Sequence, residues 1–241
     1  MQAIVISENG EEREFLSYVL RHAGLSITPI AAVKTMASSQ LKQPVDIIVL
    51  SAKSNTAPTS HAFAGTGSSR GQAASDDVVA IRALSQAPLL LLQEGLTEDQ
   101  TCDLLDAGVD LILKRPYSPR ILTRYIKIFL RRAGTVPASI LTSIQTDSIR
   151  LDPSTRMVTL VGKEPQTLTP LEFRLLYMLM TNPDQVIPLD VIIERVWGYN
   201  GEGNRELVRG LVRRLRRKIE PDPDQAHFIH NHPGVGYRFS A

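Results

Sequence analysis

The chain has 241 residues, of which 43% are hydrophobic and 22% are charged, and its formal net charge is +2 at pH 7. These values are typical of a soluble globular protein that is long enough for two ordinary domains. No apolar run approaches the ~20 residues that a membrane-spanning helix needs, so a membrane partner is not expected.

The start of the chain and its cysteine content predict a cytoplasmic protein. Met1 leads directly into an apolar run at residues 3–7, which differs from the charged opening of a secretory signal. Cys102 is the single cysteine, so the sequence offers no internal disulfide and no zinc site with several cysteine ligands. We expect neither a metal nor a cofactor.

The first 132 residues alternate between apolar runs and amphipathic segments. The apolar runs predict strands at residues 3–7, 24–30, 46–50, 88–92 and 110–113. The amphipathic segments predict helices at residues 11–24, 78–84, 97–108 and 118–132. This alternation predicts an α/β domain over residues 1–132, a doubly wound, flavodoxin-like sheet of five parallel strands covered on both faces.

Residues 52–77 interrupt this alternation. They are rich in Ala, Ser, Gly and Thr and contain one aromatic residue, Phe63. Such a composition buries little apolar surface, so the sequence predicts a flexible loop. Residues 133–145 are predicted to be a linker.

The second half has a different pattern, over residues 146–241. Alternating segments at residues 148–152 and 156–162 predict a hairpin. Thr169 and Glu172 form a capping box that opens a helix at residues 170–181. Helices at residues 189–197 and 205–220 follow, and a glycine-rich turn between two short strands closes the chain.

The helix at residues 205–220 contains seven of the basic residues of the second half. Its buried stripe is predicted to be Val208, Val212, Leu215 and Ile219, at helical spacing. The face most remote from the core is predicted to carry Leu207, Gly210, Leu211 and Arg214. A solvated charged face is one interpretation, but two helices at short connections precede this one, which is the order of a helix-turn-helix.

Four motifs between residues 148 and 240 carry a family resemblance: "LTPLEFRLLYML", "VIIERVWGY", "VRRLRRKIE" and "GVGYRF". This part resembles the winged helix-turn-helix effector domain of the OmpR/PhoB response-regulator transcription factors. The resemblance implies that helix 205–220 enters the major groove of double-stranded DNA and that residues 233–237 form a wing on the minor groove. It also implies that the loop after Trp197 contacts RNA polymerase.

The resemblance implies DNA contacts by Arg205, Leu207, Arg209, Gly210, Leu211, Arg213, Arg214, Arg216, Arg217 and Tyr237. Arg214 is predicted to read a base, and Arg209, Arg213 and Arg216 to meet phosphates. Two positions differ from the family pattern, because Pro233 replaces the usual arginine and Leu211 replaces a histidine. Leu211 therefore favours contact with a thymine methyl group. Trp197 and Phe173 are interpreted as core aromatics.

By the same resemblance the first domain corresponds to a receiver, which accepts a phosphoryl group on an aspartate after the third strand. Ser51 stands at that acceptor position. Ser7 and Glu8 occupy the positions of the Mg²⁺-binding acidic pair, Gln93 that of the Thr or Ser, and Arg115 that of the lysine. A lone hydroxyl is a poor phosphoryl acceptor without a general base, so we predict a degenerate, non-phosphorylatable receiver and no enzyme.

A receiver without phosphotransfer can still join two DNA-binding domains. The family pattern, together with the apolar surface of helix 118–132, implies a homodimer interface at Asp110, Ile121, Arg124 and Tyr125. The sequence therefore predicts an atypical two-component regulator that binds specific DNA sequences as a phosphorylation-independent homodimer. Two alternatives remain open. In one, a ligand or partner protein in the altered receiver pocket controls dimerisation, and in the other the receiver retains phosphotransfer.

Overall fold

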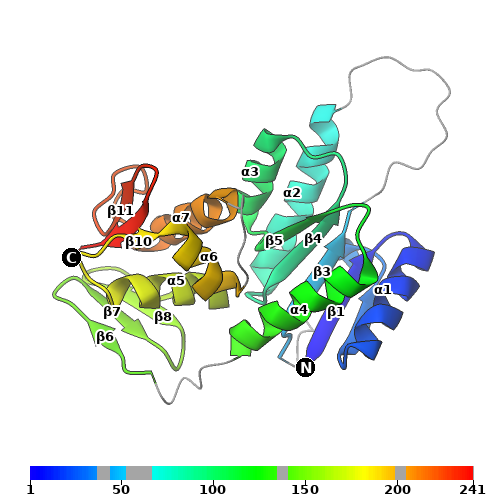
Figure 1. The fold of residues 1–241 in the computed structure, drawn as a ribbon, viewed down its shortest axis with the longest axis horizontal. Coiled ribbons are helices and arrows are strands. Elements are labelled where there is room, and N and C mark those ends of the chain that lie inside the picture. Colours follow the sequence, from blue (N-terminus) through cyan, green and yellow to red (C-terminus); the bar gives the residue numbers. More distant parts are fainter. Residues whose placement is uncertain (37–43, 53–66, 135–140, 199–204, 241) are drawn as a thin grey trace. The chain divides into compact units, whose positions relative to one another are not determined.

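The computed structural model describes residues 1–36, 44–52, 67–134, 141–198 and 205–240. The chain forms two compact units, Met1–Lys127 and Ile128–Ala241 (Figure 1). We refer to them as the N-terminal and the C-terminal unit. The division falls inside helix α4 (Pro119–Gly134), before the predicted linker at residues 133–145.

The N-terminal unit is built on a five-stranded parallel sheet with the order β2-β1-β3-β4-β5. Its strands are β1 (Gln2–Ser7), β2 (Ser26–Ile30), β3 (Ile47–Ser51), β4 (Leu89–Gln93) and β5 (Leu111–Lys114). Every residue of β3 and β4 is buried, as expected for central strands covered on both faces. The predicted doubly wound α/β fold is confirmed.

The helices of this unit lie on the two faces of the sheet. They are α1 (Gly10–His22), α2 (Gly67–Leu84), α3 (Glu98–Ala107) and α4, and a short 3₁₀ turn, η1, spans Val33–Thr35. Right-handed crossovers place α1 on the face opposite α2 and α3. Side chains cap two of them, because Asn9 accepts from the backbone N–H of Glu12 and Thr97 forms a capping box with Gln100.

Helix α2 begins earlier than the sequence predicted. The predicted flexible loop at residues 52–77 is wrong over residues 67–77, which belong to α2, whereas residues 53–66 lie outside the described part of the chain. Ala74, Val78 and Ile81 are buried at spacings of four and three residues, so they form one helical stripe. The polar composition of the segment suggested a loop. Alanine nevertheless favours helices even where polar neighbours surround it.

The C-terminal unit opens with a four-stranded antiparallel sheet. Its strands are β6 (Ile144–Gln145), β7 (Ile149–Asp152), β8 (Met157–Leu160) and β9 (Gln166–Thr167). The predicted hairpin corresponds to β7 and β8. Strand β6 was assigned to the linker, but Ile144 and Gln145 pair with Leu151 and Arg150, which extends the sheet by one edge strand.

Three helices and a second sheet complete this unit. The helices are α5 (Pro170–Met180), α6 (Leu189–Trp197) and α7 (Arg205–Ile219). The three-stranded sheet has the order β10 (Ile187–Pro188), β12 (Gly236–Phe239) and β11 (Ile229–His232). Three helices followed by a β11–β12 hairpin are the winged helix-turn-helix arrangement, so this part of the predicted fold is also confirmed (Figure 1).

Local sequence features explain how the C-terminal unit is held together. The capping box of Thr169 and Glu172 opens α5, with Pro170 in the first turn. Trp197 is 1% exposed and Phe173 is 8% exposed, which confirms both as core aromatics. Gly236 is required where β12 crosses β10, because a Cβ atom there would lie 1.9 Å from the carbonyl oxygen of Ile187.

Candidate functional site

The surface of helix α7 carries a row of arginines. Arg205, Arg209, Arg213 and Arg217 are exposed, and each lies four residues after the one before it. Residues at this spacing lie on successive turns of one helix face, so the four guanidinium groups form a row along α7. We call these four residues the arginine row. Arg216 is half-buried and donates to the carbonyl oxygen of Ile229 at 2.7 Å, which ties α7 to the wing strand β11.

The face of α7 predicted to be most remote from the core is buried. This correction applies to Leu207, Gly210, Leu211 and Arg214, of which Leu211 is 1% exposed and Arg214 is 8% exposed. The predicted apolar stripe is buried too, so the packed surface of α7 is wider than the stripe. The burial of Leu211 contradicts its predicted role as a contact for a thymine methyl group.

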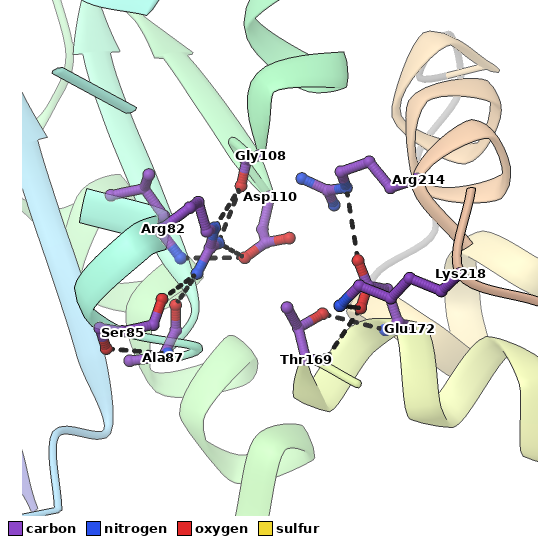
Figure 2. Close-up of polar contacts among 10 residues, drawn as sticks. Arg82, Ser85, Ala87, Gly108, Asp110, Thr169, Glu172, Arg214 and Lys218 are labelled. Carbon is purple, nitrogen blue, oxygen red and sulfur yellow. Dashed lines mark hydrogen bonds and ion pairs between the residues drawn. The ribbon is translucent and has the colours of Figure 1, made fainter. Parts of the chain in front are cut away.

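Glu172 on α5 explains the position of Arg214. Its carboxylate is 2% exposed and accepts from Lys218 Nζ at 2.7 Å and from the backbone N–H of Thr169 at 2.9 Å (Figure 2). Nε of Arg214 lies 3.9 Å from the other carboxylate oxygen. Because a buried carboxylate requires compensating charges, Glu172 draws both basic side chains toward α5.

The wing is anchored by a second buried carboxylate, that of Glu220. Its two oxygens accept from the backbone N–H groups of His227, Phe228 and Ile229 at 2.9–3.1 Å. These bonds fix the start of β11 just beyond the end of α7. Tyr237 on β12 is 6% exposed, so its ring packs inside the unit instead of projecting toward DNA as predicted.

The electrostatics of Tyr237 place it among the basic groups of this surface. Burial raises the pKa of Tyr237, and the positive charges of Arg216 and Arg209 oppose that rise. The buried ring therefore lies close enough to Arg216 and Arg209 to be influenced by their charges. The loop predicted to meet RNA polymerase follows Trp197, and residues 199–204 lie outside the described part of the chain.

The second candidate site lies at the carboxyl ends of the parallel strands. Ser7 pairs with Ser51 in the register of β1 and β3, and Gln93 ends β4. These three side chains are buried, so the structure brings three of the predicted pocket positions to one sheet edge. Glu8 is exposed, and among the described residues the side-chain oxygen of Gln93 has no hydrogen-bond partner.

The centre of this pocket is a residue that the sequence analysis missed, Glu12 in the first turn of α1. Ser51 donates to its Oε2 atom at 2.6 Å, and Ser7 donates to the same atom at 3.3 Å. Arg115 donates to Oε1 at 2.6 Å, and Tyr117 donates to Oε1 at 3.2 Å. Both carboxylate oxygens are therefore occupied by protein donors.

Arg115 connects this carboxylate to the third strand. Besides its ion pair with Glu12, it donates to the carbonyl oxygen of Ala52 at 2.9 Å and to the hydroxyl of Ser51. The side chains of Arg115 and Glu12 are 10% and 18% exposed. One positive and one negative group thus neutralise each other at the strand ends.

The pocket also changes the titration of Tyr117. Burial, together with the negative charge of Glu12, raises the pKa of Tyr117 from 10.0 to about 12. In the described part of the chain, no group of three or more His, Cys, Asp and Glu side chains is arranged to hold a metal ion. Within this pocket the charge of Glu12 is balanced by that of Arg115.

The residues predicted for a dimer interface fall into two classes. Ile121 is 51% exposed, Arg124 is exposed and Tyr125 is half-buried, so these three lie at the surface of α4. Asp110 is 1% exposed and binds Arg82 at 2.6 Å inside the N-terminal unit (Figure 2). This ion pair contradicts the predicted surface position of Asp110.

Comparison with known proteins shows which family and which proteins this chain resembles. The family described as "Transcriptional regulatory protein, C terminal" matches residues 162–239. The uncharacterised transcriptional regulatory protein YclJ of Bacillus subtilis is 34% identical over 161 residues, 66% of this chain and 70% of that protein. The DNA-binding response regulator MtrA of Mycobacterium leprae is 36% identical over 161 residues, 66% of this chain and 68% of that protein.

Two further similarities extend the comparison. The phosphate regulon transcriptional regulatory protein PhoB of Escherichia coli is 32% identical over 153 residues, 64% of this chain and 65% of that protein. A solved structure of a RitR mutant covers 99% of this chain and 98% of its own, with a TM-score of 0.72. Its sequence identity is 19%, so this likeness concerns the fold.

None of the described helices is long and apolar enough to cross a membrane.

Proposed function

This chain belongs to the OmpR/PhoB family of response regulators, and we propose that it is a transcriptional regulator that binds a specific double-stranded DNA sequence through α7 and the wing. The observation that carries the proposal is the arginine row of Arg205, Arg209, Arg213 and Arg217 on α7. Arg209, which is exposed, lies 3.8 Å from the carboxylate of Glu206. Such an exposed pair is weak, so Arg209 keeps its attraction for phosphate groups, and the exposed positive charges along α7 add to that attraction.

The proposed DNA contacts come from the exposed side chains of α7, and buried side chains support them. The arginine row meets the phosphates, which fix the register of α7 on the duplex without carrying sequence information. Arg214 is buried beside Glu172, so it supports α7 from inside the unit and is not proposed to read a base. Gly210, Arg216 and Tyr237 shape the surface around these contacts.

The receiver is proposed to act without phosphorylation. Ser51 supplies a hydroxyl where a receiver needs a carboxylate, and that hydroxyl is already hydrogen-bonded to Glu12. One carboxylate paired with Arg115 gives no support to a Mg²⁺ site, which needs several oxygen ligands. The degenerate receiver then serves to join two copies of the chain in the cytoplasm.

The proposed dimer uses the surface of α4. Ile121 and Tyr125 lie four residues apart on one helix face, with the charged Arg124 beside them. An apolar centre beside a polar rim is typical of protein–protein interfaces. RNA polymerase is the further partner proposed for the DNA-bound dimer, through the loop after Trp197.

Selection of bound DNA from a random pool tests the main proposal. The full chain should enrich one sequence pattern, present as two half-sites if the protein binds as a dimer. A variant in which Arg209 and Arg213 are both alanine should retain little DNA of any sequence. Equal recovery of all sequences by the native chain would contradict sequence-specific binding.

A separate measurement tests phosphorylation independence. Incubation with acetyl phosphate and Mg²⁺ should leave the intact mass unchanged. A gain of one phosphoryl group would overturn this part of the proposal and favour a receiver that retains phosphotransfer. A dimer that forms only after addition of a cell extract would favour the alternative in which a ligand or partner controls the receiver.

A further inference from the structure

The carboxylate of Glu12 is surrounded by donors from three separate parts of the sheet edge. Ser7 comes from the end of β1, Ser51 from the end of β3, and Arg115 and Tyr117 from the segment that follows β5. Oε1 and Oε2 each receive two of these donors. An anion held by converging donors from several strand ends is the arrangement expected of a bound ligand, yet here the anion belongs to the chain itself.

Arg115 holds this anion as it would hold a bound oxyanion. Its terminal nitrogen atoms divide between the Glu12 carboxylate and the carbonyl oxygen of Ala52. A guanidinium group that donates in two directions fixes the segment after β5 against both α1 and the end of β3. The position of that segment therefore depends on a negative charge at the place of the Glu12 carboxylate.

We propose that Glu12 is an internal anion that occupies the phosphoryl position of the receiver pocket, so that Arg115 and the segment after β5 are held in place without a transferred phosphoryl group. This inference rests on the proposed phosphorylation-independent function and gives it a physical cause. Removal of the carboxylate leaves Arg115 facing an empty anion site. A small external anion then binds there and restores the missing charge.

The test uses the full chain with Glu12→Ala and follows its thermal midpoint in chloride, acetate and phosphate at equal ionic strength. The matched control is Glu14→Ala, because Glu14 is an exposed glutamate on the same helix. A second control is the double variant Glu12→Ala, Arg115→Met, which lacks the group that binds the anion. Glu12→Gln is the conservative variant, since its amide keeps the side-chain length and removes the charge.

Glu12→Ala should melt below the native chain, and acetate or phosphate should raise its midpoint by roughly 2 °C or more relative to chloride. A smaller change in thermal midpoint, common to all proteins in these salts, is expected for the native chain, Glu14→Ala and the double variant. Glu12→Gln should lose stability and gain nothing from acetate, because its amide still fills the site. If Glu12→Ala fails to fold in chloride, its refolding yield in acetate and in chloride gives the same comparison.

Three results would overturn the inference. One is an equal gain from acetate in Glu12→Ala and in the double variant, and another is an unchanged midpoint for Glu12→Ala. The third is full stability of Glu12→Gln. The proposed function is measured separately, by sedimentation and DNA binding of the native chain without a phosphoryl donor. If the native chain forms a dimer that binds DNA, but acetate and phosphate do not stabilise Glu12→Ala, the internal anion would be rejected. The proposed function would still stand.

Discussion

Arg82 and Asp110 lie 28 residues apart in the chain and form an ion pair at 2.6 Å inside the N-terminal unit. The side chain of Asp110 is fully buried and also accepts from the backbone N–H of Leu89 at 3.0 Å. Arg82 donates in addition to the carbonyl oxygens of Gly108 and Ala87 (Figure 2). The pair therefore joins α2 to the starts of β4 and β5.

We predict that Asp110→Ala lowers the free energy of unfolding by about 3–5 kcal/mol, because it leaves the Arg82 side chain, which is 13% exposed, without its carboxylate partner. Glu94→Ala, at an exposed glutamate between β4 and α3, should change it by less than about 0.5 kcal/mol. Urea unfolding of both variants measures this difference. Unchanged stability of Asp110→Ala combined with a weaker dimer would instead support an interface role for Asp110.

Arg214 and its neighbour Arg213 should separate structural support from phosphate contact. We predict that Arg214→Ala lowers the free energy of unfolding by about 1–3 kcal/mol, measured with urea, and shows no preference between the specific site and scrambled DNA. Arg213→Ala, in the arginine row, should weaken both alike and reduce the salt slope by about one unit. Titration of both duplexes at several salt concentrations provides the measurement. A larger loss on the specific duplex than on the scrambled one for Arg214→Ala would instead assign base reading to Arg214.

Tyr125→Asp should shift the protein toward monomer, since it places a charge in the proposed apolar interface of α4. We expect dimer affinity to fall at least about tenfold, or roughly 1.4 kcal/mol. Val79→Asp is a suitable control, because Val79 is an exposed apolar residue on α2, away from that surface. Sedimentation at micromolar concentration measures both. A native chain that sediments as a monomer would contradict the proposed dimer.

Tyr117 should titrate at a higher pH than an ordinary tyrosine, because its pKa is raised from 10.0 to about 12. Burial is the larger cause and the negative charge of Glu12 is the smaller one. The folded state holds this proton more tightly than the unfolded state. The stabilising contribution of Tyr117 is therefore complete below pH 10 and is lost as the pH rises from about 10 to about 12. An absorbance titration of phenolate should show the late component in the native chain and lose it in Tyr117→Phe. Persistence of that component in Tyr117→Phe would assign it to another tyrosine.

Local patterns in the sequence were sufficient for the elements and for the family. Short apolar runs predicted the five parallel strands, and the Thr169–Glu172 capping box located the start of α5. These features depend on neighbours within a few residues, so a single pass along the chain detects them. The start of α2 was missed because Ala74, which is buried, is a residue that composition alone counts as weakly apolar.

The partners of the charged side chains were decided by the tertiary structure. Arg115 meets Glu12 across 103 residues, and Lys218 meets Glu172 across 46 residues. The sequence identified Arg115 and Ser51 as pocket positions, but it gave no reason to place Glu12 between them. Similarly, helical spacing put Arg214 on an outer face, and the buried carboxylate of Glu172 drew it toward α5. A charge pairs with whatever the fold brings near it, and that proximity arises only when the strands and helices have packed.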